Sequence, residues 1–287
     1  MGIAAPPSIA QAIAPGETIE PLFERGNQAQ DRGDYREAER IFREAVRRYP
    51  DDAGAYNNLG RALYHQGDLE AAIAYYRRSI DLYDGDEAAH HNLGLALQEQ
   101  GDSDGAITSF RRALTLNAAY TEAYVGLGLT FYGQGDLDSA IANYRRAIAV
   151  DPNYAYAHNN LGVVLKEQGD LEGALSSYLR AIAISPDYAN AHSNIGELLI
   201  EQGNIEGAIV SYRRALAAPE DTASTPTTAH TAAYTGLAYA LMSRDRPGDL
   251  EAAIAYLETA LTLDPTYEEA QRRYQDAQAR LGGRRDR

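Results

Sequence analysis

The sequence repeats itself every 34 residues, and this period constrains the fold more than any single motif does. Shifting the chain against itself by one period superposes glycines, alanines and aromatic residues. The glycines that coincide are Gly26, Gly60, Gly94, Gly128, Gly162 and Gly196, and the alanines are Ala38, Ala72, Ala106, Ala140, Ala174 and Ala208. Such self-similarity indicates a stack of small units that share one elongated core, with no separate catalytic domain.

The repeated unit is clearest in residues 155–188, AYAHNNLGVVLKEQGDLEGALSSYLRAIAISPDY. Apolar residues recur at helical spacing in its first half and again in its second half. Gly169 stands between the halves, where a helix ends in a left-handed residue, and Asp170 follows as an N-cap acceptor. Pro186 then stops the second helix. The pattern therefore predicts a helix hairpin.

The period and the order Leu-Gly, Ala, Tyr or Phe, Ala and Pro resemble the tetratricopeptide repeat family from about residue 19 to residue 267. This resemblance implies an all-α fold. It also implies a right-handed superhelical α-solenoid of about seven helix hairpins, with a C-terminal capping helix and with the first helices lining the concave side.

The register of the pattern sets the predicted organisation of the chain. The solenoid is expected at 19–267, with repeats near 19–52, 53–86, 87–120, 121–154, 155–188, 189–222 and 231–267. The Thr-, Ala- and Pro-rich stretch after Leu216 breaks the register, which predicts a loop insertion at 223–230. A capping helix is expected at 268–281 and a flexible tail at 282–287.

Residues 1–18 are apolar, uncharged over most of their length and rich in proline. Ala10-Gln11-Ala12 has the small-x-small form of a signal-peptidase site, although a positive n-region is missing. Two interpretations stay open, a disordered leader and the remnant of an export signal over residues 1–12. Location in the cytoplasm and export are therefore both compatible with the sequence.

The formal net charge is -15, and the chain has no cysteine. The negative field argues against a nucleic-acid partner, whose phosphates would be repelled. No apolar run approaches the ~20 residues of a membrane-spanning helix, so no membrane insertion is expected. Without cysteine there is neither a disulfide nor a thiolate metal site.

We predict no enzyme activity, no cofactor and no metal site. No nucleophile has a base at a spacing that predicts catalysis, and the acidic residues are explained by caps and exposed faces. His90, His158 and His192 occupy the same position in different repeats, and corresponding residues of adjacent repeats are expected about 10 Å apart if repeats pack as helices do. Metal ligands must converge more closely than that, so these histidines are expected to pack locally.

The candidate binding residues lie on the first helices. Asn58, Asn92, Asn160 and Asn194 share one repeat position, which in the family faces the groove. The series resembles the asparagine ladder of O-linked N-acetylglucosamine transferase repeat domains, although no transferase domain follows. It is interrupted at Gly126 and absent at Gly236. An asparagine carries a donor and an acceptor, so it can pair with the backbone of an extended peptide. The alternative is that each asparagine bonds only within its own helix or to its neighbour. The remaining candidates in this predicted groove are Asn57, Arg61, Asn159 and Lys166.

The charges of the predicted groove select the class of ligand. Acidic residues outnumber Arg61 and Lys166 there; they are Glu20, Glu24, Asp31, Glu99, Glu122, Glu167, Glu197 and Glu201. The resemblance to the carboxylate clamp of chaperone-binding members fails, because Phe23, Asn57 and Ala88 stand where cations are needed. We therefore predict a non-catalytic scaffold that binds a neutral or basic segment of another protein.

The alternative is a structural module that assembles with itself or with a larger complex through its edges or its outer face. Arg78, Arg112, Arg146, Arg180 and Arg214 recur once per repeat on the second helices. Such a row of arginines could bind an anionic partner. We favour the alternative, a solvated face whose guanidinium groups pair with carboxylates. The loop at 217–230 is a further candidate surface.

Overall fold

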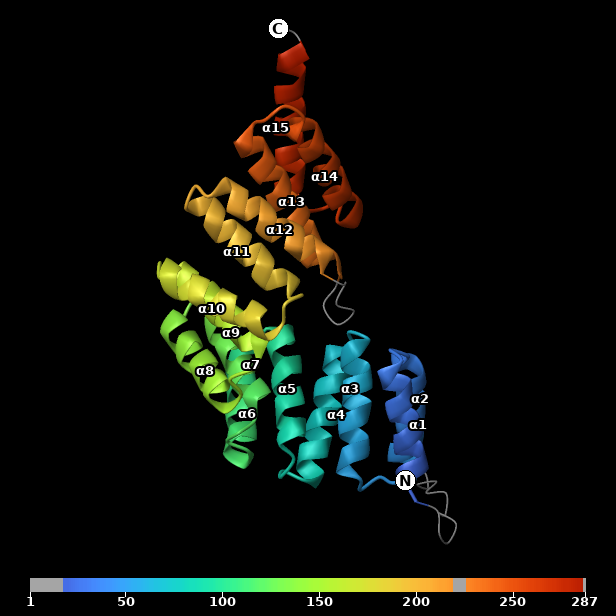
Figure 1. Cartoon of the computed structure of the whole chain (residues 1–287). Coiled ribbons are helices and arrows are strands. Elements are labelled where there is room, and N and C mark those ends of the chain that lie inside the picture. Colours follow the sequence, from blue (N-terminus) through green and yellow to red (C-terminus); the bar gives the residue numbers. More distant parts are fainter. Residues whose placement is uncertain (1–17, 219–225, 286–287) are drawn as a thin grey trace, which may run out of the picture. The chain divides into compact units, whose positions relative to one another are not determined.

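The structure is a computed structural model that describes residues 18–218 and 226–285 (Figure 1). These residues form helices joined by short turns, without a strand in the described part of the chain. The helices are α1 (Glu20–Asp31), α2 (Tyr35–Arg48), α3 (Ala53–His65), α4 (Leu69–Leu82), α5 (Glu87–Gln100), α6 (Ser103–Leu116), α7 (Thr121–Gly133), α8 (Leu137–Val150), α9 (Ala155–Glu167), α10 (Leu171–Ile184), α11 (Ala189–Glu201), α12 (Ile205–Ala217), α13 (Pro226–Arg244), α14 (Asp249–Leu263) and α15 (Glu268–Arg285). The all-α helical-repeat solenoid is thus confirmed.

The chain divides into two compact units, Met1–Asn143 and Tyr144–Arg287, and the division falls within α8. Within each unit the helices pack as a stack of hairpins. In the first unit α3 packs against α4, and α4 packs against α5 of the next hairpin. In the second unit α9 packs against α10, α10 against α11 and α12 against α13. Each hairpin therefore buries its apolar faces against its neighbours in the chain.

The hairpin turns have the geometry that the sequence predicts. Gly169 follows α9 with φ 90°, a left-handed conformation that a residue with a Cβ adopts only at a cost. Asp170 then caps α10, because its Oδ1 accepts a hydrogen bond from the backbone N–H of Gly173 at 2.9 Å. The same two devices recur through the stack, since Gly33, Gly67, Gly101, Gly135 and Gly203 also have positive φ.

A glycine on the first helix meets an aromatic ring of the second helix where the two helices of a hairpin cross. A Cβ on Gly162 would lie 2.6 Å from Cε1 of Tyr178 and 3.1 Å from the carbonyl oxygen of Ala174. Tyr178 and Ala174 are fully buried. The two helices thus cross closely at this glycine, and the absence of a side chain on it sets the helix separation.

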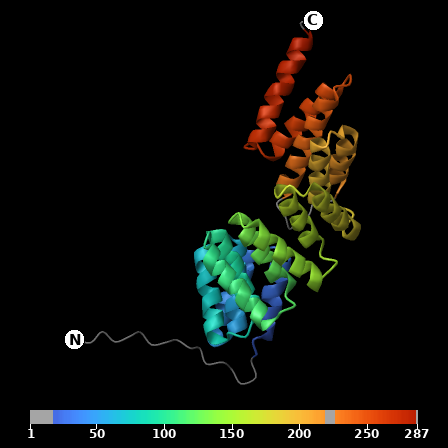
Figure 2. The ribbon, with the colours of Figure 1, turned by 90° about the vertical axis from the view of Figure 1, so that its left-hand side faces the viewer.

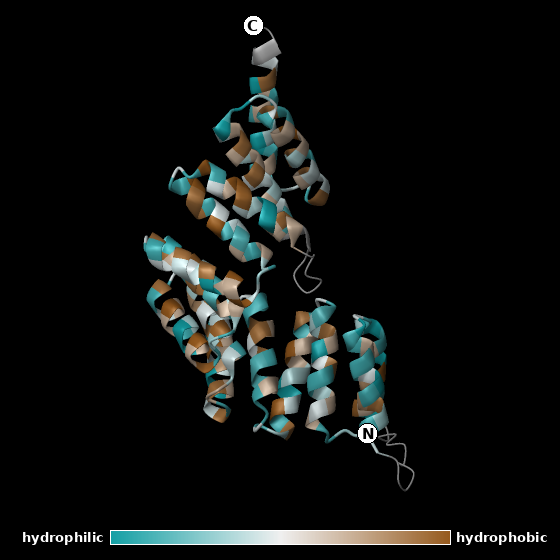
Figure 3. Ribbon diagram, viewed as in Figure 1, coloured by the Kyte–Doolittle hydropathy of each residue, from teal (hydrophilic) through white to brown (hydrophobic). Residues whose placement is uncertain are grey.

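The core of each unit lies between helices of successive hairpins. One cluster of buried residues includes Ile41, Leu59 and Phe110, and the other includes Ile209, Leu237 and Leu257. Apolar and polar residues alternate along single helices, as the brown and teal bands of Figure 3 show. In the part of the chain that the structure describes, no helix is both long and apolar enough to cross a membrane.

The last hairpin and the final helix differ from the predicted boundaries. Helix α13 begins at Pro226, so the end of the stretch predicted as a loop insertion at 223–230 is helical. The sequence showed no apolar period there, but proline suits the first position of a helix because the N–H it lacks has no partner at that position. Residues 219–225 lie outside the described residues.

Helix α15 packs against α14 and α13, and Figure 2 shows it alongside the last hairpin. It continues to Arg285, beyond the predicted end at 281 and into the tail predicted at 282–287. A Cβ on Gly282 or Gly283 would meet nothing within 4 Å, and the helix continues there because each added residue gains a backbone hydrogen bond. Residues 286–287, and 1–17 of the predicted leader, lie outside the described residues.

The turn between α13 and α14, residues 245–248, is one residue longer than most of the other hairpin turns and is held by an ion pair. Asp249 is buried and receives Nη2 and Nε of Arg244 at 2.6 and 2.9 Å. Its Oδ2 also accepts the backbone N–H of Arg246 at 2.9 Å. Glu206 on α12 joins this network through Arg246 at 2.6 Å and Arg244 at 3.3 Å. The longer turn is thus attached to the preceding hairpin.

Replacing Gly162 with Ala should destabilise the protein, because the added methyl overlaps the Tyr178 ring. Overpacking of this kind costs about 1–3 kcal/mol in the free energy of unfolding. The matched control is Gly133→Ala at the exposed end of α7, where a Cβ meets nothing within 4 Å. That change should leave stability unchanged or raise it by up to about 1 kcal/mol. Urea unfolding followed by circular dichroism measures both, and equal effects would contradict the close crossing.

Replacing Asp249 with Asn should lower the thermal stability at neutral pH and much less at acidic pH. Hydrogen bonds from Arg244 lower the pKa of Asp249 below its ordinary value, and burial opposes them only in part. A lowered folded-state pKa stabilises the protein fully above the unfolded pKa of about 3.9, and this stabilisation is lost as the pH falls through the folded-state pKa. Melting temperatures of wild type and variant at pH 7 and pH 3 test this. A difference that does not shrink at pH 3 would exclude the ion pair, and Glu251→Gln on the exposed start of α14 is the control.

Candidate functional site

All eight candidate residues lie on first helices of hairpins. Helix α3 carries Asn57, Asn58 and Arg61, α5 carries Asn92, α9 carries Asn159, Asn160 and Lys166, and α11 carries Asn194. We call the surface formed by α1, α3, α5 and α7 in the first unit, and by α9, α11 and α13 in the second, the first-helix face. Each unit has its own such face, because α3 contacts α5 and α9 contacts α11 across the repeats.

In the first unit, side-chain hydrogen bonds connect the first helices of three consecutive hairpins. Nδ2 of Asn92 donates to Oδ1 of Asn57 at 3.0 Å. Nη2 of Arg61 donates to Oε1 of Gln30, and Nε2 of Gln30 donates to the carbonyl oxygen of Asn58 at 3.0 Å. Arg61 therefore donates to a neutral amide, and among the described residues no carboxylate forms an ion pair with it.

In the second unit the same kinds of contact connect α9 and α11. Nδ2 of Asn194 donates to Oδ1 of Asn159 at 2.9 Å, and Asn159 is buried. Nζ of Lys166 bridges Oε2 of Glu197 at 2.7 Å and Oε1 of Glu201 at 3.1 Å. Burial alone would lower the pKa of Lys166, but the two glutamates outweigh it and raise this pKa above the usual lysine value. Lys166 is thus charged and fully committed to these carboxylates.

Both kinds of contact follow from the register of the repeat. Asn57 and Asn92 are 35 residues apart, as are Asn159 and Asn194. Gln30 and Arg61 are 31 residues apart, and the same spacing separates Lys166 from Glu197. The sequence reasoning missed the roles of Gln30 and Glu197, although their spacing from the candidate cations was a visible signal. One pair of repeat positions therefore carries an amide contact in one unit and an ion pair in the other.

Two polar atoms on the first-helix face of the second unit are buried without a hydrogen-bond partner, Nδ2 of Asn160 and Oγ of Ser193. The residue 35 positions before Asn160 in the sequence is Val125, whose side chain has no hydrogen-bond acceptor. Ser193 occupies the repeat position of Asn159, and the ladder position of the next repeat is Gly236. Both atoms thus stand at repeat positions where the usual amide partner is missing from the sequence. Buried polar groups in proteins rarely lack a partner.

The two gaps in the asparagine series have a steric reason. A Cβ on Gly126 would lie 2.6 Å from Cζ of Phe110, and a Cβ on Gly236 would lie 2.5 Å from Cε1 of Tyr212. At both positions an aromatic ring from the preceding hairpin occupies the space that an asparagine side chain needs. At these two gaps the missing side chain and the close ring therefore fit each other.

The histidines make local contacts. Nε2 of His90, His158 and His192 lies 3.1, 3.0 and 2.8 Å from the carbonyl oxygens of Asp84, Pro152 and Pro186, each six residues earlier in the chain. All three rings are buried in their own repeats. Over residues 18–218 and 226–285, no group of three or more potential ligands is placed to hold a metal ion.

The fold and the repeat geometry agree with comparisons to known proteins. The tetratricopeptide repeat profile matches residues 23–87, 91–142 and 193–268, and a TPR repeat profile matches residues 131–169 and 164–203. A comparison with curated proteins found no match.

Several solved structures are similar. A chain of the APC/C hetero-tetramer Cut9-Hcn1 is 18% identical to this chain, with a TM-score of 0.69. The alignment covers 90% of this chain and 46% of the Cut9-Hcn1 chain, so this chain spans less than half the length of that protein chain. A tetratricopeptide repeat protein from Parabacteroides merdae ATCC 43184 is also 18% identical, with a TM-score of 0.67 and coverage of 90% and 98%. A thermophilic TPR protein from Thermus thermophilus, TTC0263, is 28% identical, with a TM-score of 0.53 and coverage of 68% and 100%.

Proteins built from this repeat are generally non-catalytic scaffolds that bind other proteins or peptides. The profile matches extend over more than half of the sequence, and the helix hairpins have the predicted period. The chain belongs to the tetratricopeptide repeat family.

Proposed function

We propose that the protein is a non-catalytic scaffold that holds an extended, neutral or basic segment of another protein along its first-helix face. The polar groups for this are those of the asparagine series and its neighbours. The proposal rests on three properties of the face, namely an amide donor without a partner, amides that are held in place, and an excess of exposed carboxylates.

The observation that carries the proposal is the unpartnered Nδ2 of Asn160. This donor is buried within the chain, and Oδ1 of the same side chain receives only a long contact of 3.4 Å from Asn159. A buried donor without a hydrogen-bond partner destabilises the folded state by about 1–3 kcal/mol. The Asn160 side chain as a whole is half-buried, so a rotation of its amide would bring this donor to a backbone carbonyl oxygen of a bound segment, and binding then removes a cost that the free protein carries.

Asn194 offers the complementary group. Its Nδ2 is held by Asn159, which fixes the orientation of the side chain and leaves Oδ1 without a hydrogen bond among the described residues. An acceptor held in this way fits a backbone N–H of a bound segment. Preorganised groups bind more tightly because less side-chain freedom is lost on binding. One donor and one acceptor in adjacent repeats match the alternation of C=O and N–H in an extended chain.

The charges favour a neutral or basic partner. Glu99, Glu122 and Glu167 on the first helices are exposed, as are both glutamates that hold Lys166. Lys166 is neutralised by these glutamates, and Arg61 is engaged with Gln30. With a net charge of -15 on the whole chain, an acidic segment would be repelled.

Assembly through the outer face is the second candidate, and two exposed apolar residues favour it. Leu179 on α10 and Val210 on α12 are 48% and 51% exposed on second helices. Apolar side chains at the surface stabilise an interface when a second molecule covers them. Light scattering over a range of protein concentrations distinguishes this function, because self-assembly raises the molar mass in the absence of any peptide.

The peptide proposal is tested by selecting an extended peptide from a random display library and measuring its affinity by calorimetry. Asn160→Ala removes one net hydrogen bond, worth about 0.5–1.5 kcal/mol, so the affinity should fall about 2-fold to 12-fold. Arg180→Ala on the second-helix side is the matched control and should leave the affinity unchanged. Affinity for a basic peptide should weaken with added salt, whereas the loss caused by Asn160→Ala should not depend on salt. Failure to select any peptide, or equal affinities of wild type and Asn160→Ala, would overturn the proposal.

The two asparagines should differ in their effect on stability. Asn194→Ala removes the donor that satisfies the buried Oδ1 of Asn159, so the free energy of unfolding should fall by about 1–3 kcal/mol. Asn160→Ala removes a donor that has no partner and should change stability by no more than about 0.5 kcal/mol or raise it. Urea unfolding of both variants measures this. Equal destabilisation would show that Asn160 is paired within the protein and does not await a ligand.

A further inference from the structure

A cavity of about 290 Å³ lies at the C-terminal end of the first-helix face of the second unit. Its walls come from α11, the core ring of Tyr212, α13 and the start of α15. The floor is open because Gly236 has no side chain, and the Tyr212 ring lies directly beneath it. At this ladder position, which carries an asparagine in the preceding repeat, the backbone of Gly236 and the Tyr212 ring form the floor of the cavity.

Carboxylates dominate the polar part of the cavity. Glu197 and Glu201 line it from α11 and Glu269 from α15, against the single guanidinium of Arg273. One oxygen of each carboxylate already contacts a cationic side chain of the protein. Nζ of Lys166 pairs with Oε2 of Glu197 and with Oε1 of Glu201. Nε of Arg273 donates a hydrogen bond to Oε1 of Glu269 at 2.9 Å. The second oxygens of Glu197 and Glu201 have no hydrogen bond among the described residues, and that of Glu269 receives only Tyr267 at 3.5 Å. Acceptors therefore remain for a further cation.

An independent observation points to a ligand at the same place. Oγ of Ser193 is buried, has no hydrogen-bond partner, and belongs to a residue that lines the cavity. Buried hydroxyl groups are nearly always paired with protein or bound water. A polar group that enters the cavity would provide the missing partner.

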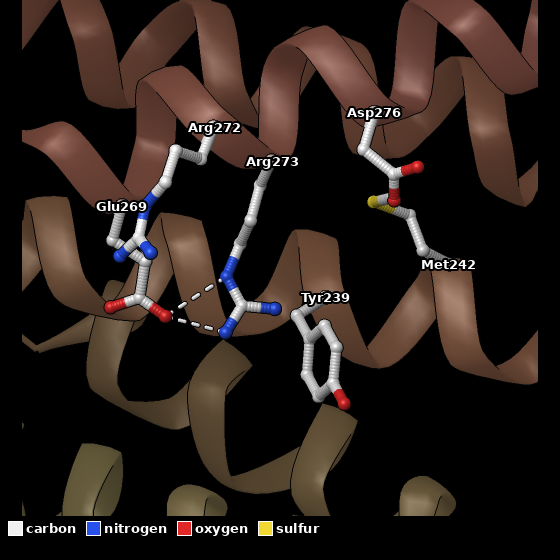
Figure 4. Close-up of a pocket in the computed structure, with 6 residues that line it drawn as sticks. All are labelled: Tyr239, Met242, Glu269, Arg272, Arg273 and Asp276. Carbon is white, nitrogen blue, oxygen red and sulfur yellow. Dashed lines mark hydrogen bonds and ion pairs between the residues drawn. The ribbon is translucent and has the colours of Figure 1, made fainter.

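The cavity lining already holds one cation, the guanidinium group of Arg273, between a carboxylate and an aromatic ring. The guanidinium carbon of Arg273 lies 3.9 Å from the centroid of the Tyr239 ring while its nitrogens contact Glu269. Figure 4 shows this arrangement from the adjoining pocket, with the Arg273 side chain between Glu269 and Tyr239. An aromatic face beside a carboxylate attracts positive charge through the ring quadrupole and the ion pair together. Tyr212 and Tyr267 add two more rings to the lining.

We propose that this cavity binds the ammonium group of a lysine side chain. This inference rests on the proposed function, because the lysine would belong to the segment bound along the first-helix face. A compact ammonium group with three donors suits several separate acceptors better than a planar guanidinium does. An anionic side chain would meet three carboxylates and one engaged guanidinium. The cavity would therefore determine the register of the segment, by placing one lysine at the end of the asparagine series.

The test uses the full chain, labelled with nitrogen-15, and titrates it with Nα-acetyl-lysine N-methylamide. The backbone amide signals of Gly236 and Ser193 should shift and saturate in the millimolar range. The norleucine analogue has the same alkyl chain without the charge, and the glutamate analogue has the opposite charge; neither should shift these signals. Equal shifts with norleucine, larger shifts with glutamate, or no shift with the lysine compound would overturn the proposal.

Two variants locate the effect. Glu269→Gln should weaken binding of the lysine compound at least 5-fold, and Ser193→Ala should weaken it to a smaller degree. Glu172→Gln on the second helix α10 is exposed, lies outside the cavity lining and should leave binding unchanged. Melting temperatures verify that each variant folds, and Ser193→Ala serves where the loss of the Glu269–Arg273 pair prevents folding. Unchanged binding in both cavity variants would place the compound elsewhere.

The outcome separates this inference from the proposed function. Binding of the lysine compound without selection of any peptide would support the cavity and refute the peptide scaffold. Peptides that lose affinity with Asn160→Ala, but keep it when their lysines are replaced by norleucine, would support the scaffold and refute the lysine site.

Discussion

The contact between a glycine on the first helix and an aromatic ring on the second is the constraint on which each hairpin depends. At Gly60, Gly94 and Gly162 a Cβ would come within 2.6–2.7 Å of the ring of Tyr76, Phe110 or Tyr178. The ring is fully buried in each case, so it fixes both the separation of the two helices and the surface offered to the next hairpin. Because successive hairpins stack on these surfaces, one local contact sets the repeat geometry throughout each unit.

The same geometry determines which polar side chains meet. Residues at fixed separations of 31 and 35 positions come together on adjacent first helices, whichever side chains they carry. In one unit the 31-residue pair is Gln30 with Arg61, and in the other it is Lys166 with Glu197. The fold thus determines which positions meet, and the residue types determine whether a hydrogen bond forms there. The Nδ2 donor of Asn194 is bonded within the protein, whereas the Nδ2 donor of Asn160 is not.

The end of the second unit departs from this regularity where the repeat pattern changes. Gly236 replaces an asparagine, the turn after α13 is lengthened and held by Asp249, and α15 covers the last hairpin. A terminal helix is needed because the last hairpin has no following repeat to bury its face. Since α15 also brings Glu269 and Arg273 to the edge of the first-helix face, the helix that caps the core creates the charged cavity.

The sequence by itself determined the fold and most helix boundaries, because a 34-residue period with glycine followed by aspartate or asparagine at each turn leaves few alternatives to a stack of helix hairpins. It also placed the candidate asparagines on the first helices. It did not show that Asn92 and Asn194 are held by Asn57 and Asn159 while Asn160 is not, since a hydrogen bond between repeats depends on the side-chain positions that packing produces. Nor did it reveal the start of α13 at Pro226 or the cavity beside Gly236. The first follows from the local preference of proline for the start of a helix, which the missing apolar period concealed. The cavity arises from packing among α11, α13 and α15, which only the tertiary structure decides because no local pattern in the sequence encodes a space between three helices.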